Sequence, residues 1–374
     1  MRKFVKPVLL VLLVLILFLV GSYGYLFAIR SNDLRRQERH LARLEVRYQS
    51  GHGAGNEMVS VDFDLDDESI QLNRLRLLGS HNSYKKTGPA IGRLFIALGA
   101  NSDEARALRY GYRTLTEQLE SGIRSMEWDV RLRGGRFELT HVPIVDHSSV
   151  APDVEGALEE LRLYSVHHPR HLPIVILMEI KRDWMMLDLA LQPVGTSELR
   201  ALDQLIESKL SDRLHRPRDL VAQVQSRGAV EPGMSLRKAV QTHGWPSLPA
   251  LLGKVLFVLH AGELTTAYYE ADPTFQVQTM FPSVYAIGVD RDYAAFVIHN
   301  TPDPEVISGL VQAGFIVRTR IDSDLVFRQA RFDDAWRSGA QILTSDFTVG
   351  RSDLPAAAVI YLPGNKMTVL GGED

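Results

Sequence analysis

The chain has 374 residues, of which 45% are hydrophobic and 23% charged, and this composition excludes a wholly disordered, collagen-like or coiled-coil protein. Its 42 basic and 45 acidic residues give a net charge of -3, without the positive excess of a nucleic-acid-binding surface, so we expect no nucleic acid as a partner. The sequence contains no cysteine, which excludes disulfides, thiolate metal ligands and a cysteine nucleophile.

The amino terminus has the pattern of a membrane anchor. Residues 7–20 are almost all Leu, Val, Ile and Phe, and the apolar run continues to Ile29, which is long enough to span a bilayer. Arg2, Lys3 and Lys6 precede this run and favour a cytoplasmic amino terminus with the rest of the chain on the far side. We therefore predict a signal anchor at 1–30 and a membrane-anchored, extracytoplasmic protein. Secretion after cleavage of a signal peptide is the alternative.

The segment that follows differs in composition from both of its neighbours. It begins as a charged helical pattern and ends in the Gly-rich sequence GHGAGN at 51–56, so we interpret residues 31–65 as a stalk. Residues 66–374 form the third predicted region, a single folded body.

Short apolar runs separated by helical patterns recur through this body. We predict eight strands, at 75–80, 123–130, 136–141, 173–180, 254–260, 295–300, 315–321 and 340–345. Helical stretches at 152–165, 197–210 and 323–339 favour parallel pairing, and eight such units predict an α/β fold of the TIM-type (β/α)8 barrel class. Only two glycines separate the second run from the third, which indicates an antiparallel hairpin or a distorted part of the barrel.

Polar side chains stand at the carboxyl ends of these strands, where barrel enzymes carry their chemistry. Residues two apart on a strand share a face, so Glu127 and Asp129 point the same way. The apolar Met126, Trp128 and Val130 make the other face. An unpaired carboxylate such as Glu179 at the end of a buried strand costs several kcal/mol, so its position calls for a cation.

An all-oxygen ligand set can be assembled from these strand ends. Carboxylate and amide oxygens suit Ca2+, whereas zinc recruits histidines more often. The two histidines near these ligands, His81 and His141, are suited to proton transfer. Positive side chains could compensate an anionic substrate. The predicted metal ligands are Asn82, Glu127, Asp129 and Glu179, and the predicted substrate contacts are Lys181, Arg318 and Arg320.

Six segments in this order resemble the calcium-dependent phosphoinositide-specific phospholipase C family in its compact bacterial and fungal form. The resemblance covers roughly residues 70–370 and depends on His-Asn, Glu-x-Asp, His and Glu following one another at successive strands. The segments are GSHNSYK (79–85), QLESGIRSMEWDVR (118–131), THVP (140–143), HPRHLPIVILMEIK (168–181), GFIVRTRID (314–322) and GAQILTSDF (339–347).

The resemblance implies a phosphoric diester hydrolase that cleaves the glycerol–phosphate bond of phosphatidylinositol. The inositol 2-hydroxyl would attack phosphorus, giving a cyclic inositol phosphate and diacylglycerol. It further implies that His81 stabilises the phosphorane, that His141 protonates the leaving oxygen, and that the four metal ligands hold Ca2+. Glu127 is also a candidate general base. The implied partners are the membrane and its phospholipids, with no obligate protein partner.

Four other functions remain open. A glycerophosphodiester phosphodiesterase also uses a barrel, carboxylates and two histidines, but typically opens with His-Arg where this chain has His81 and Asn82. A metal-independent phosphatidylinositol lyase would carry a basic residue where this chain has Glu127 and Asp129. The chain could also be a phosphodiesterase of broader phospholipid specificity, or a catalytically silent, membrane-tethered barrel that binds phospholipid headgroups.

Several other features are less specific. The cluster His167, His168 and His171 is interrupted by Pro169, so we interpret it as a turn rather than a metal site. His260 and His299 are candidates for residues that support the site, and Asp346 for a substrate contact or a helix cap. The apolar segments 91–100 and 183–191 follow two strands on the active-site side. We interpret both as core packing, with contact to a bilayer as the alternative.

Overall fold

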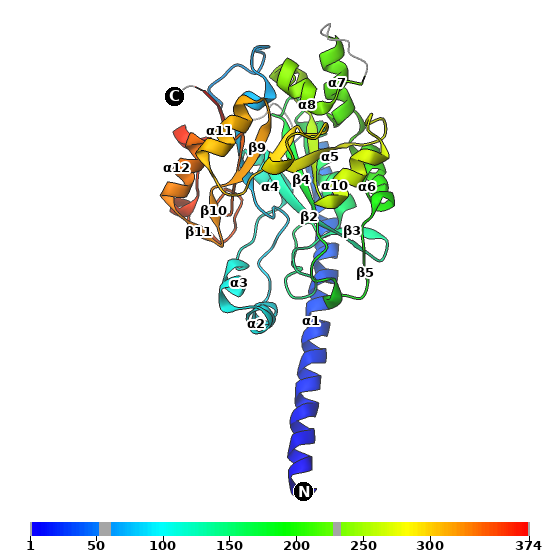
Figure 1. Ribbon diagram of the computed structural model, residues 1–374. Helices are drawn as coiled ribbons and strands as arrows, with labels where there is room; N and C mark the ends of the chain where they lie inside the picture. The colour runs from blue at the N-terminus through cyan, green and yellow to red at the C-terminus, as the bar shows by residue number, and fades with distance from the viewer. Residues whose placement is uncertain (1, 52–60, 227–232, 373–374) are drawn as a thin grey trace.

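The fold is a closed barrel of eight parallel strands, seen in a computed structural model that describes residues 2–51, 61–226 and 233–372 (Figure 1). Each barrel strand pairs in parallel with the next, and the last pairs with the first. In order around the barrel the strands are β1 (Leu75–Ser80), β2 (Ser125–Arg133), β4 (Ile174–Ile180), β6 (Val255–His260), β7 (Met280–Tyr285), β8 (Phe296–Ile298), β9 (Ile316–Arg320) and β12 (Ile342–Ser345).

The predicted TIM-type barrel is thus confirmed, but one of its predicted members is wrong. The run at 136–141 contains β3 (Arg136–Leu139), which pairs antiparallel with the end of β2 and lies outside the barrel. Its place in the barrel is taken by β7, whose sequence MFPSVY contains a proline and therefore gave no strand signal. The antiparallel hairpin that the two intervening glycines indicated is confirmed, because β3 pairs antiparallel with the end of β2.

The remaining strands are short additions. Strand β5 (Leu191–Gln192) pairs antiparallel with β2, and β13 (Thr368–Leu370) pairs antiparallel with β1. Strands β10 (Asp322–Ser323) and β11 (Val326–Phe327) pair with each other in a separate two-stranded sheet.

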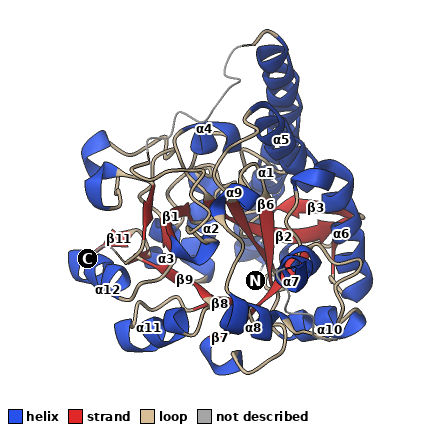
Figure 2. Cartoon of the chain, turned by 90° about the horizontal axis from the view of Figure 1, so that it is seen from above, coloured by secondary structure: helices blue, strands red, loops and turns tan. Residues whose placement is uncertain are grey.

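Helices surround the barrel (Figure 2). The α-helices are α1 (Arg2–Gln49), α2 (Ala90–Gly99), α3 (Ser102–Ala107), α4 (Leu115–Glu120), α5 (Val154–His167), α6 (Thr196–Leu210), α7 (Pro217–Ser226), α8 (Leu236–Lys238), α9 (Leu248–Leu251), α10 (Glu263–Ala271), α11 (Pro304–Gln312) and α12 (Gln329–Arg337). Short helical turns are η1 (Leu72–Arg74), η2 (Met185–Leu187), η3 (Ser211–Arg213), η4 (Ala239–His243), η5 (Ala286–Gly288), η6 (Ala356–Ala358) and η7 (Pro363–Asn365).

The two faces of β2 explain how the strand positions the site. Met126, Trp128 and Val130 are fully buried in the apolar layer between strands and helices, where the Trp128 ring contacts Phe257 on β6 at 6.3 Å between centroids. Because side chains alternate along a strand, Glu127 and Asp129 point to the opposite side, into the barrel.

Helix α1 is a single helix of 48 residues, about 70 Å long, whose amino-terminal half projects away from the barrel (Figure 1). Among the described residues it is the one helix long and apolar enough to cross a membrane, on length and composition. Its second half is helical, as the pattern at 31–49 predicted, and lies against the barrel with Asp33, Gln37 and Leu44 buried. The Gly-rich end of the predicted stalk lies largely outside the described residues, and the division of the chain into three regions stays a prediction.

Candidate active site

Three carboxylates meet at the carboxyl end of two neighbouring strands. Glu127 and Asp129 stand on β2 and Glu179 stands on β4, where Asp129 lies directly opposite Glu179 in the strand register. One oxygen from each of the three lies within 4.8 Å of the other two. All three are candidate ligands of one ion, as their spacing along the sequence suggested.

Asn82 stands beside them in the loop after β1. Its backbone has φ 48°, a left-handed conformation that asparagine tolerates better than most residues. The next residue, Ser83, exchanges two hydrogen bonds with β2, one from Ser83 N to the Glu127 carbonyl and one from Glu127 N to Ser83 Oγ, both 3.0 Å. These bonds hold the loop against the strand that carries two of the carboxylates.

Several oxygens of this group accept no hydrogen bond from the described residues. The Asn82 side chain donates through Nδ2 to the Tyr110 hydroxyl at 2.9 Å, which leaves its buried Oδ1 without a hydrogen bond among the described residues. Neither carboxylate oxygen of the buried Asp129 accepts a hydrogen bond from the described part of the chain. Since most buried acceptors in folded proteins are paired, these three oxygens are available to a ligand.

Lys181 supplies the nearest positive charge. Its Nζ lies 3.0 Å from Glu179 Oε1 and 3.9 Å from Asp129 Oδ2. Burial raises the pKa of Asp129 to about 7, although Lys181 opposes the shift. Burial also acts to raise the pKa of Glu179, but Lys181 outweighs it and the pKa falls below its usual value. Asp129 therefore has no close positive partner of its own, and a cation beside it would favour its charged form.

His81 is held by a buried carboxylate from the last strand of the barrel. Its Nδ1 lies 2.7 Å from Asp346 Oδ1, and the other Asp346 oxygen accepts a hydrogen bond from Arg320 Nη2 at 2.9 Å. Burial, followed by the charge of Arg320, lowers the pKa of His81 well below 6.5. Neutral His81 donates its Nδ1 proton to Asp346, so its Nε2 carries a lone pair.

His141 stands in the loop after β3, close enough to His81 for its charge to lower the pKa of that residue. Its Nδ1 lies 3.6 Å from Asp146 Oδ2, too far for a good hydrogen bond. The other oxygen of Asp146 accepts a bond of 3.0 Å from the fully buried Lys85. Asp146 and Lys85 therefore support this histidine. Neither was identified from the sequence, although Lys85 lies within the GSHNSYK segment.

The two predicted arginines both reach the site and have different partners. Arg318 points into the barrel, where its guanidinium donates to Glu127 and Asn300, and its Nε donates to Thr344 Oγ1 at 3.0 Å. Arg320 contacts Asp346, as described above. Arg318 and Arg320 are two residues apart on β9 and share one face, so Arg318 lies beside a candidate ligand and Arg320 lies behind His81.

A pocket of about 940 Å3 adjoins these residues at the ends of β6 and β7. His260 lies in its wall, opposite Glu179 in the strand register, and bonds Ser283 Oγ and the Tyr285 hydroxyl, both at 3.1 Å. His260 therefore does border the site, as the sequence suggested. His299 follows β8, and its backbone N–H donates to the Arg318 carbonyl at 2.9 Å.

Other sequence interpretations are settled by the surroundings of each residue. His171 is buried and bonds Ser165 Oγ at 2.8 Å, and His168 stacks on Tyr164, so the cluster before β4 is a packed turn, as expected. No helix begins directly after Asp346, so the helix-cap interpretation of that residue is wrong.

The core-packing interpretation of the segments 91–100 and 183–191 is also wrong. Several large apolar side chains are exposed in both segments, by 75% at Leu98 and by 97% at Leu189, while Phe95 is half-buried.

Fold and site together define a metal-dependent enzyme built on a TIM-type barrel. A sequence model of the family described as phosphoinositide phospholipase C, Ca2+-dependent, matches residues 70–140 and 131–370. The chain therefore belongs to that family. It is a phosphoric diester hydrolase of the phospholipase C type that acts on phosphoinositides, with Ca2+ as its metal. The resemblance stated from the sequence is confirmed.

Solved structures support the fold. The apo form of the calcium-dependent phosphoinositol-specific phospholipase C from Pseudomonas sp. is 16% identical, with a TM-score of 0.57 over 82% of this chain and 97% of that one. The Ca2+-dependent enzyme from Streptomyces antibioticus is 19% identical, with a TM-score of 0.54 over 74% and 95%. A search of curated proteins finds no match.

Proposed function

We propose that the barrel cleaves phosphatidylinositol-type lipids by attack of the inositol 2-hydroxyl, releasing diacylglycerol and a cyclic inositol phosphate. The observation that carries this proposal is the group of buried oxygens of Asn82 and Asp129, which accept no hydrogen bond from the described residues, beside Glu127 and Glu179. Each remaining predicted residue has a role in the same reaction.

The donor set fits Ca2+. It consists of carboxylate and amide oxygens, and the three carboxylates lie close enough together to share one ion. When bound, Ca2+ would lower the pKa of the attacking hydroxyl and offset charge on the phosphoryl oxygens. Asn82, Glu127, Asp129 and Glu179 are the proposed ligands, and Lys181, Arg318 and Arg320 are positioned to contact or balance the substrate phosphate.

Protons move between named groups in this mechanism. The proton of the 2-hydroxyl passes to Glu127, or to the lone pair on His81 Nε2, as the new oxygen–phosphorus bond forms. His81 then stabilises the phosphorane, with Asp346 fixing its ring. His141 gives its proton to the glycerol oxygen as the phosphorus–oxygen bond breaks, and Asp146 stabilises the charged imidazole before that step.

We further propose that the anchor at 1–30 is retained and that the barrel is extracytoplasmic. Arg2, Lys3 and Lys6 before the apolar run support this orientation. Release of the barrel by cleavage near residue 30 is the alternative.

Phosphorus NMR on a panel of phospholipids tests the reaction. With the full chain in detergent micelles, we expect a cyclic phosphate from phosphatidylinositol and no product in EGTA. Direct formation of an acyclic phosphate, or rescue by Mg2+, would favour a glycerophosphodiester phosphodiesterase. Headgroup binding without turnover would identify a silent barrel.

A further inference from the structure

Helix α1 is built into the barrel along one face, from Ser22 to Tyr48. The buried positions recur every four or seven residues, which places them on one stripe of the helix, and none of them is more than 8% exposed. The stripe consists of Ser22, Leu26, Asp33, Gln37, Leu44 and Tyr48. Side chains between these positions, such as Arg35 and Arg39, face solvent.

Polar bonds lock this face in one register. Gln37 makes two bonds of 3.0 Å to the backbone of Asp153, one through each side-chain atom. Asp33 accepts from Lys86 Nζ and from the Ser149 backbone N–H at 3.3 Å. Such buried pairs are costly to break, since each partner would be left unsatisfied.

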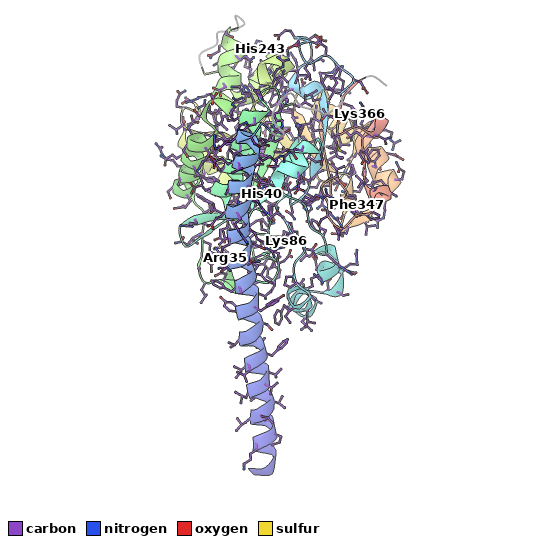
Figure 3. All side chains as sticks on the ribbon, turned by 180° about the vertical axis from the view of Figure 1, so that it is seen from behind. Arg35, His40, Lys86, His243, Phe347 and Lys366 are labelled. Carbon is purple, nitrogen blue, oxygen red and sulfur yellow. The ribbon has the colours of Figure 1, made fainter. Side chains whose placement is uncertain are left out.

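Further bonds connect the same face of α1 nearer to its apolar half. Arg30 Nε donates to Glu138 Oε2 at 3.0 Å, and the Leu26 carbonyl lies 2.8 Å from His147 Nε2. Lys86 follows β1, and His147 follows β3, so these partners lie in loops that also carry His81 and His141. Figure 3 shows His40 on α1 and Lys86 beside this helix, on the same side of the barrel. The helix is therefore attached beside the mouth of the barrel.

This attachment directs the mouth towards the apolar half of α1. The loop after β1 forms α2, which lies on the same side of the barrel as the free end of α1 (Figure 1). The Phe95 ring of α2 is 6.4 Å from the Phe18 ring of α1, between centroids. Gly92 lets α2 approach the loop behind it, because a Cβ there would lie 1.9 Å from the Val145 carbonyl oxygen.

The level of α2 corresponds to the boundary of a bilayer. Tyr23 and Tyr25 are half exposed on α1, and tyrosines of this kind mark the membrane–water interface. Phe18 lies about 8 Å deeper along the helix axis than Tyr23. Amphipathic helices bind with their apolar face about 5–10 Å into this boundary. Because Phe95 lies beside Phe18, it lies at that depth.

Further exposed apolar side chains lie around the mouth of the barrel. They belong to α2, to the loop after β4 and to the turn after β7, all of which follow carboxyl ends of barrel strands. Exposed apolar groups concentrated at one end of a protein mark an interaction surface. We define the rim as Leu94, Leu98, Trp184, Met186, Leu189 and Ile287.

We propose that α1 holds the rim against the same bilayer in which its amino-terminal half is inserted, so that the enzyme draws lipids from its own membrane. The occupant of the rim is the lipid bilayer, because the rim continues the apolar surface of a helix long enough to span it. The part concerning lipid turnover rests on the proposed function, whereas the contact of the rim with lipid does not.

Site-directed labelling tests the contact directly, because the chain contains no cysteine. A fluorophore on Leu98→Cys or on Leu189→Cys, in the full chain reconstituted into phosphatidylcholine vesicles, should be quenched by brominated lipid. The control Ala222→Cys, exposed on α7 at the opposite end of the barrel, should be quenched only by a water-soluble quencher. Equal access of the water-soluble quencher to all three labels would overturn the proposal. The rim would then be open to water, and a protein would be the better candidate for its partner.

A pair of insertions tests the role of α1. A short Gly-Ser insertion after Gly24 breaks the helix between the apolar span and the docked positions from Leu26 onward, whereas the same insertion after Gly51 leaves the two joined. We expect only the first to weaken quenching of the Leu98→Cys label. An equal effect of both insertions, or no effect of either, would contradict a rigid connection.

Turnover distinguishes this proposal from the proposed function. Vesicles that carry both enzyme and substrate should be hydrolysed at least about tenfold faster than protein-free substrate vesicles mixed with enzyme vesicles, because tethering raises the local lipid concentration. The insertion after Gly24 should reduce that preference, and a preference unchanged by it would contradict the proposal. Absence of turnover in detergent as well would refute the proposed function, while the labels would still decide where the rim lies.

Discussion

Two groups of buried polar side chains in this molecule differ in how they are paired. Along the docked face of α1, Asp33 and Gln37 each find partners on the barrel. At the mouth, Asn82 Oδ1 and both oxygens of Asp129 are buried but accept no hydrogen bond from the described residues.

This difference separates a structural contact from a binding site. A buried polar group that is paired stabilises one arrangement of the chain, whereas an unpaired one costs free energy unless a ligand satisfies it. Asp33 and Gln37 therefore hold the helix, and the mouth is the site that we propose for an ion. Each of the following predictions alters one side of this comparison.

Removal of Ca2+ should have the largest effect. We expect EGTA to abolish phosphatidylinositol hydrolysis and Asp129→Asn to lower kcat by at least about a hundredfold, because the negative charges at the mouth then lack their counter-ion. Release of a radiolabelled headgroup measures both effects, and excess Ca2+ should restore the wild type after EGTA. Full activity in EGTA would contradict the metal site.

Loss of a histidine at the mouth should come next. His81→Ala or His141→Ala should lower kcat by at least about a hundredfold, which is the usual contribution of a positioned proton donor or acceptor. His243→Ala is a matched control, since His243 lies at the far end of the barrel (Figure 3). Equal losses in all three variants would point to a general folding defect.

Breaking the docked face should reduce stability. Asp33→Ala leaves the Ser149 N–H and Lys86 without their acceptor, so we expect the free energy of unfolding to fall by about 1–3 kcal/mol. Glu38→Ala, at an exposed position of the same helix, should change it by less than about 0.5 kcal/mol. Urea denaturation of the detergent-solubilised chain measures both, and similar values would show that the docked face adds no stability.

The smallest expected effect concerns His171, a buried group whose two ring nitrogens are both paired. Burial lowers its pKa to about 3. The unfolded chain takes up a proton near pH 6.5 while the folded chain does not, so its contribution to stability falls as the pH drops below 6.5 and continues to fall towards pH 3. The loss is about 1.4 kcal/mol per pH unit. Urea denaturation at pH 6 and pH 5 measures how the free energy of unfolding depends on pH. This dependence should be shallower in His171→Gln than in the wild type, and an identical slope would exclude His171 as the source of the dependence.

Much of the fold could be predicted because the pattern of apolar residues is local. Apolar runs such as 173–180 and 254–260 predicted buried strands correctly. Glu127 and Asp129 could be assigned to one face of their strand because they are two residues apart. The strand β7 could not be found in this way, since Pro282 interrupts its pattern. The hairpin arm β3 was counted in its place, although the two glycines before it already indicated the antiparallel pairing with β2.

The supporting residues of the site were harder to predict. Asp346 contacts His81 across 265 positions of the sequence, and Asp146 binds Lys85 across 61. No local spacing relates such residues, so their pairing follows only from closure of the barrel. The docked face of α1 was missed for the same reason. Its partners are backbone groups and side chains of distant loops.

The sequence by itself predicted the oxygen donors, the two histidines, most of the barrel strands and the apolar helix at the amino terminus, because residue type and short-range period encode these features. Only the tertiary structure decided which buried acceptors stay unpaired, which carboxylate supports each histidine, and that the anchor helix lies beside the mouth. Those features depend on contacts between residues far apart in the chain, and such contacts exist only after the first strand and the last have paired.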